Sequence, residues 1–71
     1  MRLDLHGVRH HEVSKLLDAF IWENIKRNNK QIAIITGNSD IMKKVVKECL
    51  NDYGMEARED HMNGPTLIVD L

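Results

Sequence analysis

The chain has 71 residues, of which 42% are hydrophobic and 30% charged, and this length allows one small domain. A chain this short buries about 60–65% of the surface that its unfolded form exposes, so its core is small and a functional site must lie on the outside. Its single cysteine, Cys49, excludes an internal disulfide, which fits a reducing compartment. We therefore expect residues 1–71 to form one stand-alone domain without a deep cofactor cleft.

The charge balance restricts what the chain can bind. Ten Lys and Arg residues against eleven Asp and Glu residues give a net charge of -1, whereas a protein that holds nucleic acid by charge alone is usually basic. Any nucleic-acid contact must therefore be local. Neither a signal peptide nor an apolar run long enough for a membrane span is found, so we expect no membrane partner. The expected location is the cytoplasm, of a bacterium or of a phage-infected cell.

The first predicted element is a short strand over residues 3–6, in which apolar and polar side chains alternate. The alternation places Leu3 and Leu5 toward the helices of the fold. It places Asp4 and His6 on the opposite face.

Two helices are predicted from apolar residues spaced three and four apart. The first covers residues 10–28, where Asn28 can adopt the left-handed conformation that ends a helix. The second begins after a cap at Asn38 or Ser39, and Gly54 stops it. The apolar stripe of the first helix consists of Val13, Leu16, Leu17, Phe20 and Ile21. The stripe of the second consists of Ile41, Met42, Val45, Val46, Cys49, Leu50 and Tyr53.

Three further strands complete the predicted fold. Residues 32–35 are a continuous apolar run typical of a covered strand, residues 55–59 form a weaker strand, and residues 66–71 form the last one. The last two are expected to make a hairpin around a turn at Asn63, with His61 in the loop. The first two, joined by a helix, are expected to be parallel. This order predicts an α/β fold, an α+β two-layer sandwich with two helices on one face of a four-stranded mixed sheet.

Asp4 and His6 are the first candidate site residues. Two positions apart on a strand, they share a face, and a carboxylate and an imidazole at this spacing suit acid–base work on one phosphodiester. His6 also lies at the carboxyl end of its strand, where sites collect in open α/β sheets. The alternative is that both residues only form the solvent face of an amphipathic strand.

The turn Thr36-Gly37-Asn38-Ser39 is the second candidate. It follows a strand and opens a helix, so its backbone N–H groups and the helix dipole favour an anion. Gly37 would let a phosphate approach the backbone closely. The alternative is an ordinary strand-to-helix turn with a cap. Because neighbouring parallel strands end side by side, His6 is expected near Gly37.

Basic side chains flank both features. Lys43 and Lys44 lie in the early turns of the second helix, and a solvated helix face is the alternative for them. Arg9, His10 and His11 follow the first motif and could flank the same ligand. A metal site built from His6 and the two histidines after Arg9 lacks a convincing ligand set, so no metal ligand is assigned and Mg²⁺ is left open as a cofactor. The predicted phosphate-binding set is Gly7, Arg9, Thr36, Gly37, Asn38, Ser39, Lys43 and Lys44.

Two further residues have alternative interpretations. Trp22 lies roughly opposite the apolar stripe of its helix, where it can stack on a base, contact a partner, or pack at a helix edge. Cys49 lies on the buried stripe of the second helix with no base at helical spacing beside it. We therefore expect Cys49 to be a core residue and not a nucleophile.

These motifs together resemble the small MutS-related (Smr) domain family over essentially the whole chain. The family's L-D-x-H motif is matched by Leu3, Asp4 and His6. Its T-G-x-G motif is matched by Thr36 and Gly37, whereas serine stands where the second glycine is usual. The resemblance implies a fold similar to the C-terminal domain of translation initiation factor three. It also implies a nucleic-acid-binding domain, often one that nicks or cleaves DNA or RNA.

We therefore predict an endonuclease that cleaves a phosphodiester backbone of RNA or of structured or single-stranded DNA, acting as a monomer or a weak homodimer. Asp4 and His6 are its predicted catalytic residues. One alternative is a non-catalytic module that binds RNA or a ribosome, favoured by the near-neutral charge. Another is a protein-interaction adaptor that works through Trp22 and the hairpin.

Overall fold

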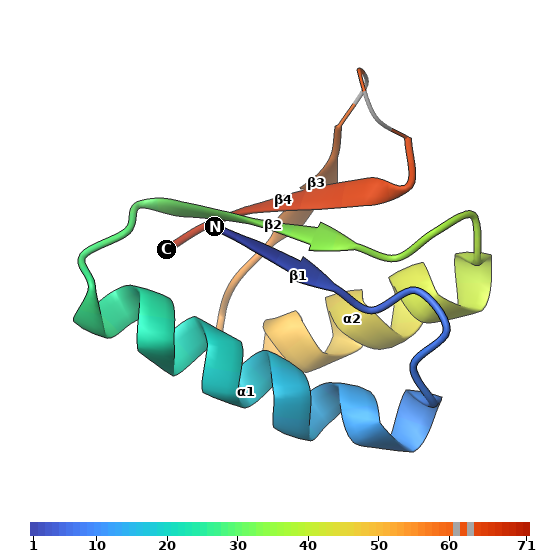
Figure 1. Ribbon diagram of the computed structural model, residues 1–71, viewed down its shortest axis with the longest axis horizontal. Coiled ribbons are helices and arrows are strands. Elements are labelled where there is room, and N and C mark those ends of the chain that lie inside the picture. The colour runs from blue at the N-terminus through green and yellow to red at the C-terminus, as the bar shows by residue number, and fades with distance from the viewer. Residues whose placement is uncertain (61, 63) are drawn as a thin grey trace.

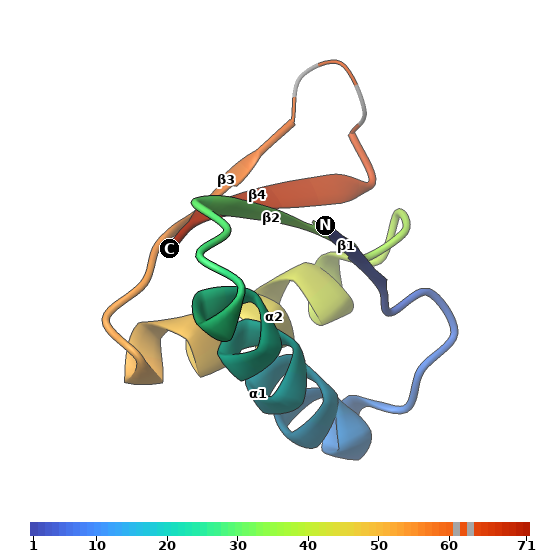
Figure 2. The same cartoon turned by 60° about the vertical axis from the view of Figure 1, so that its left-hand side comes forward.

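The computed structural model describes residues 1–60, 62 and 64–71, which form a sheet covered on one face by two helices (Figures 1 and 2). His61 and the turn predicted at Asn63 lie outside the described residues. The elements in chain order are β1 (Arg2–Asp4), α1 (His10–Lys26), β2 (Gln31–Ile35), α2 (Asp40–Asp52), β3 (Ala57–Glu59) and β4 (Thr66–Asp70). The predicted order of strands and helices and the two-layer architecture are confirmed.

The four strands form one mixed sheet in the order β1-β2-β4-β3. β1 and β2 are parallel, as predicted, whereas β4 runs antiparallel to both β2 and β3. β1 and β2 therefore end on the same side of the domain, and α1 and α2 both begin there (Figure 1). This shared end brings the two sequence motifs together, because each motif joins a strand to the helix that follows it.

The core lies between the sheet and the helices, but each helix buries a narrower stripe than its sequence predicts. From α1 the buried apolar residues are Val13, Leu17 and Ile21; from α2 they are Met42, Val46 and Leu50. The prediction was wrong for Leu16, Ile41 and Tyr53, which are 40%, 63% and 40% exposed. These three side chains are therefore partly in contact with solvent. The hydroxyl of Tyr53 instead donates to the Asp18 carboxylate, which ties the end of α2 to α1.

The helix ends follow the predicted local chemistry. Asn28 has a φ of 59°, the left-handed conformation expected after the first helix. The Ser39 hydroxyl accepts a hydrogen bond from the backbone N–H of Met42 at 3.0 Å, which confirms the predicted cap of α2. Gly54, with a φ of 71°, lies just past the end of α2.

Leu5 continues the core beyond the end of β1. Its backbone N–H donates to the carbonyl oxygen of Ile35 at 2.8 Å, and its side chain is fully buried. Asp4 and His6 on either side of it are exposed, as the alternation predicted. Among the residues that the structure describes, no helix is long and apolar enough to cross a membrane.

Candidate nucleic-acid interface

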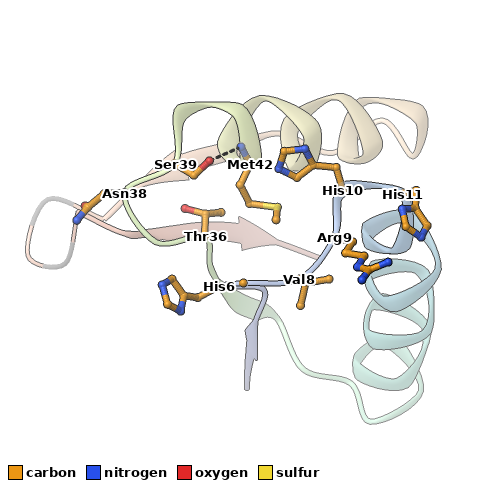
Figure 3. A pocket seen from close by; sticks show the side chains of 10 residues that line it. His6, Val8, Arg9, His10, His11, Thr36, Asn38, Ser39 and Met42 are labelled. Atoms are coloured by element: carbon orange, nitrogen blue, oxygen red, sulfur yellow. Dashed lines mark hydrogen bonds between the residues drawn. The ribbon is translucent and has the colours of Figure 1, made fainter.

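An open hollow of about 1000 Å³ lies at the end of the domain where β1 and β2 stop and α1 and α2 begin (Figure 3). One side of it is the segment from His6 to His11, which joins β1 to α1. The other side is formed by the β2–α2 turn and the first turn of α2, through Thr36, Asn38, Ser39 and Met42.

The hollow is lined by potentially cationic side chains and by no carboxylate of the described residues. Arg9 and three histidines, His6, His10 and His11, contribute to its wall. The chain carries eleven Asp and Glu residues, so their absence from this wall is a local feature of the surface. The N-terminal ends of two helices add their positive dipole ends to the same space. The electrostatics of the hollow therefore suit an anionic ligand, although the net charge of the whole chain is -1.

The His6 ring lies against the backbone of Gly37. A Cβ atom added at Gly37 would lie 2.8 Å from Cδ2 of His6, which is closer than side-chain carbon atoms approach one another. Gly37 also has a φ of 72°, a conformation that glycine adopts without strain. The expected proximity of the two motifs is thus present in the structure, and it depends on a residue without a side chain at position 37.

Asp4 contacts the backbone of His6 and not its ring. The carboxylate oxygen Oδ1 of Asp4 accepts a hydrogen bond from the His6 backbone N–H at 2.9 Å. This bond closes a tight turn directly after β1, of the kind that aspartate forms with a backbone donor two residues on. The contact lets Asp4 fix the chain direction at His6, which determines where the imidazole is presented.

The β2–α2 turn is fixed by the end of the β3–β4 connection. The carbonyl oxygen of Pro65 accepts hydrogen bonds from the N–H groups of Thr36 and Gly37 at 2.8 and 3.2 Å. It also accepts from the Thr36 hydroxyl at 3.0 Å, and that hydroxyl lies 3.0 Å from the carbonyl oxygen of Gly37 as well. These donors therefore hold the turn in place and are not free for a phosphate. The N–H groups left for an anion are those of residues 38–41, which bond to no other described residue.

Lys43 and Lys44 do not join this hollow. They line a second one, between α2 and β3, where Lys43 Nζ lies 3.6 Å from Oε1 of Glu59. Four carboxylate side chains line that second hollow: Asp40, Glu48, Glu56 and Glu59. The structure thus separates these two lysines from His6, and their surroundings are of mixed charge.

Sequence reasoning missed two contributors to the hollow, Val8 and Met42. Val8 follows the L-D-x-H motif by two residues, and Met42 lies one turn into α2. Met42 was treated only as part of an apolar stripe and Val8 was not considered, although their position beside the motifs is the signal that would have found them. His10, which was considered as a flanking residue of the same ligand and as a metal ligand, also lines the hollow. No group of three metal-ligating side chains occurs within residues 1–60, 62 and 64–71, so these residues build no metal cage.

Cys49 and Trp22 lie away from the hollow. Cys49 is partly buried against the core, and burial, followed by the negative charge of Asp52, raises the pKa of its thiol. A raised thiol pKa lowers the thiolate fraction, which argues against a nucleophilic role. Trp22 is 57% exposed on α1, so a contact with a partner remains a prediction.

The fold and the hollow define a small α+β domain whose site lies where two parallel strands end. The protein-family model of the Smr domain matches residues 3–64, and the chain belongs to the Smr domain family. Smr domains bind nucleic acids, and nicking activity is known in the family.

The Smr domain of Thermus thermophilus MutS2 has a similar crystal structure, with a TM-score of 0.87 and 16% sequence identity. The similarity covers 99% of this chain and 95% of that one, and it supports the fold. No curated protein matches the chain in sequence.

Proposed function

We propose that this Smr domain binds nucleic acid at the hollow between the two motifs and cleaves or nicks a phosphodiester bond there, in RNA or in structured or single-stranded DNA. The observation that carries the proposal is that the exposed imidazole of His6 lies at the rim of the hollow. The wall of this hollow contains Arg9 and no carboxylate among its described residues. A polyanion is attracted to such a surface, and carboxylates would repel it.

His6 is the proposed acid–base group. Its ring is exposed, and Gly37 holds it from one side, so it can take a proton from the attacking hydroxyl group as the new bond to phosphorus forms. On RNA the attacking group is the neighbouring 2′-hydroxyl, and on DNA it is water. The leaving oxygen takes a proton from solvent water as its bond to phosphorus breaks. Asp4 acts through the backbone of His6, as a positioning residue, and no step of this proposal requires a metal ion.

The phosphate is proposed to lie between His6, Arg9 and the first turn of α2. The free N–H groups of residues 38–41 lie at and just before the N-terminus of α2, whose dipole favours negative charge that develops on the phosphate oxygens. Ser39 keeps its hydroxyl proton for donation, because in the cap of α2 its oxygen acts as an acceptor. Serine can therefore serve where the family usually has glycine.

The test is a cleavage assay with labelled single-stranded RNA, single-stranded DNA and branched DNA, each with Mg²⁺ and with chelator. We expect His6→Ala to lower the cleavage rate about 100-fold or more. Arg9→Ala should weaken binding, whereas Lys30→Ala removes the same charge from the opposite end of β2 and serves as the matched control. Equal cleavage by wild type and His6→Ala would overturn the catalytic part of the proposal.

A second candidate is a binding module without catalysis. It is supported by the turn at Thr36 and Gly37, whose two N–H groups are occupied by Pro65 and cannot stabilise a developing charge. This candidate predicts salt-dependent retention of RNA that Arg9→Ala weakens, with no cleavage of any substrate. Detection of a cleaved product that His6→Ala abolishes would reject it.

A further inference from the structure

The hollow between the motifs has an apolar floor as well as a polar rim. Val8 and Met42 line this floor: Met42 belongs to the hydrophobic core and is 3% exposed, and Val8 packs against that core. Figure 3 shows the ring of His10 turned toward Met42. A phosphate alone makes no use of such a floor, because a strongly hydrated anion gains nothing from apolar contact.

A nucleobase has the chemistry that this floor and rim would recognise. Its flat faces are apolar and stack on imidazole rings, and its edge carries hydrogen-bonding groups. The free N–H groups of Asn38 and Ser39 and the Ser39 hydroxyl belong to lining residues of the hollow, where they can donate to carbonyl or ring-nitrogen acceptors of a base. Val8 follows His6 by two residues, so an occupant of the floor lies beside the phosphate at His6.

We propose that the hollow takes one unpaired nucleobase, stacked on His10 over Val8 and Met42, next to the phosphate at which His6 acts as the acid–base group. This inference rests on the proposed function and adds to it the class of substrate, an unstacked nucleotide. A base inside a duplex is paired at its edge and stacked on both faces, and its extrusion costs a few kcal/mol. The domain should therefore prefer single strands, loops and branch points over plain duplex.

The experiment uses a series of short single-stranded oligonucleotides, each with a single abasic site at a different position. An abasic site removes one base and leaves every phosphate in place, so the electrostatic part of binding is unchanged. Fluorescence anisotropy with wild type should show one position at which the abasic site weakens binding about tenfold, the scale of one base–aromatic stack. The other positions should stay near the affinity of the intact oligonucleotide.

The second part of the experiment uses His10→Ala. Because His10 is exposed, the substitution leaves the fold intact. It should weaken binding of the intact oligonucleotide about tenfold and remove the difference between the intact and abasic forms. Lys30→Ala, at an exposed residue that does not line this hollow, is the control and should keep that difference.

The outcomes separate this inference from the proposed function. Binding that is insensitive to the abasic site at every position overturns the base pocket and leaves the phosphate site standing. Equal affinity for duplex and single strand also overturns it. No binding of any oligonucleotide at low salt overturns the proposed function together with this inference.

Discussion

The imidazole of His6 and the backbone of Gly37 are packed so closely that a Cβ atom at position 37 would lie 2.8 Å from His6 Cδ2. The two residues are the meeting point of the L-D-x-H and T-G motifs. Because β1 and β2 are parallel neighbours, the segments after them run side by side, and a glycine in the second leaves room for the ring of the first. The geometry at this contact leads to the first prediction.

Gly37→Ala should displace the His6 ring, whereas Gly54→Ala should not. Both glycines have almost the same φ, 72° and 71°, so each alanine variant should lose about 1–2 kcal/mol of unfolding free energy through backbone strain. An added Cβ at Gly54 meets no atom within 4 Å, which makes Gly54→Ala a matched control. Urea unfolding measures the shared loss, and NMR of the His6 ring protons measures the displacement. Unchanged His6 signals in Gly37→Ala would contradict the contact.

Asp4 is expected to act through its hydrogen bond to the His6 backbone and not through its charge. Asp4→Asn keeps an oxygen acceptor at the same place, so it should retain most binding and cleavage. Asp4→Ala loses the acceptor and should lower the unfolding free energy by about 1 kcal/mol together with activity. If Asp4→Asn is as inactive as Asp4→Ala, the negative charge itself takes part, which is the catalytic role that the sequence suggested.

The order of the elements could be predicted from sequence because each signal is local. The apolar spacing in α1 and α2, the cap at Ser39 and the left-handed residue at Asn28 depend on neighbours within a few positions. The parallel pairing of β1 and β2 followed from the helix between them. Those signals also placed His6 near Gly37, since each residue comes two positions after a strand end.

The contacts that decide the role of Thr36 were beyond prediction because they are long-range. They require β4 to insert between β2 and β3, which brings Pro65 to a turn 29 residues earlier in the chain. The spacing of apolar residues along the sequence does not indicate the order of the strands in a sheet. Lys43 is a second example. Its partner Glu59 comes from the edge strand β3, a pairing that the sequence does not reveal. The sequence alone therefore placed Lys43 beside the phosphate.

Thr36 is expected to stabilise the turn and not to contact the ligand. Its side chain is 2% exposed and its hydroxyl donates to the Pro65 carbonyl, so Thr36→Val should lower the unfolding free energy by about 1–2 kcal/mol. Thr36→Ser keeps the donor and should recover the hydrogen-bond part of that loss. Urea unfolding of the three proteins measures the effect. A Thr36→Val protein of wild-type stability that has lost affinity for oligonucleotides would instead assign the hydroxyl to the ligand.

The open face of the sheet should show an acid-sensitive ion pair. Asp70 on β4 accepts hydrogen bonds from Arg58 Nη1 at 2.8 Å and from Gln31 Nε2 at 3.1 Å. The bond from Arg58 and then the bond from Gln31 hold the pKa of Asp70 below its ordinary value of 3.8. A carboxylate with a lowered folded-state pKa stabilises the fold above its unfolded-state pKa, and that stabilisation is lost as the pH falls through the folded-state value.

A double-mutant cycle of Asp70→Asn and Arg58→Met, measured by urea unfolding, isolates this pair. We expect a favourable coupling at pH 6 that persists down to about pH 4 and disappears below the lowered pKa of Asp70. Added salt should reduce the coupling at pH 6, because both side chains are more than half exposed. A coupling that stays equal from pH 6 to pH 2 would show that the two side chains interact through packing, since protonation of Asp70 removes the charge on which the ion pair depends.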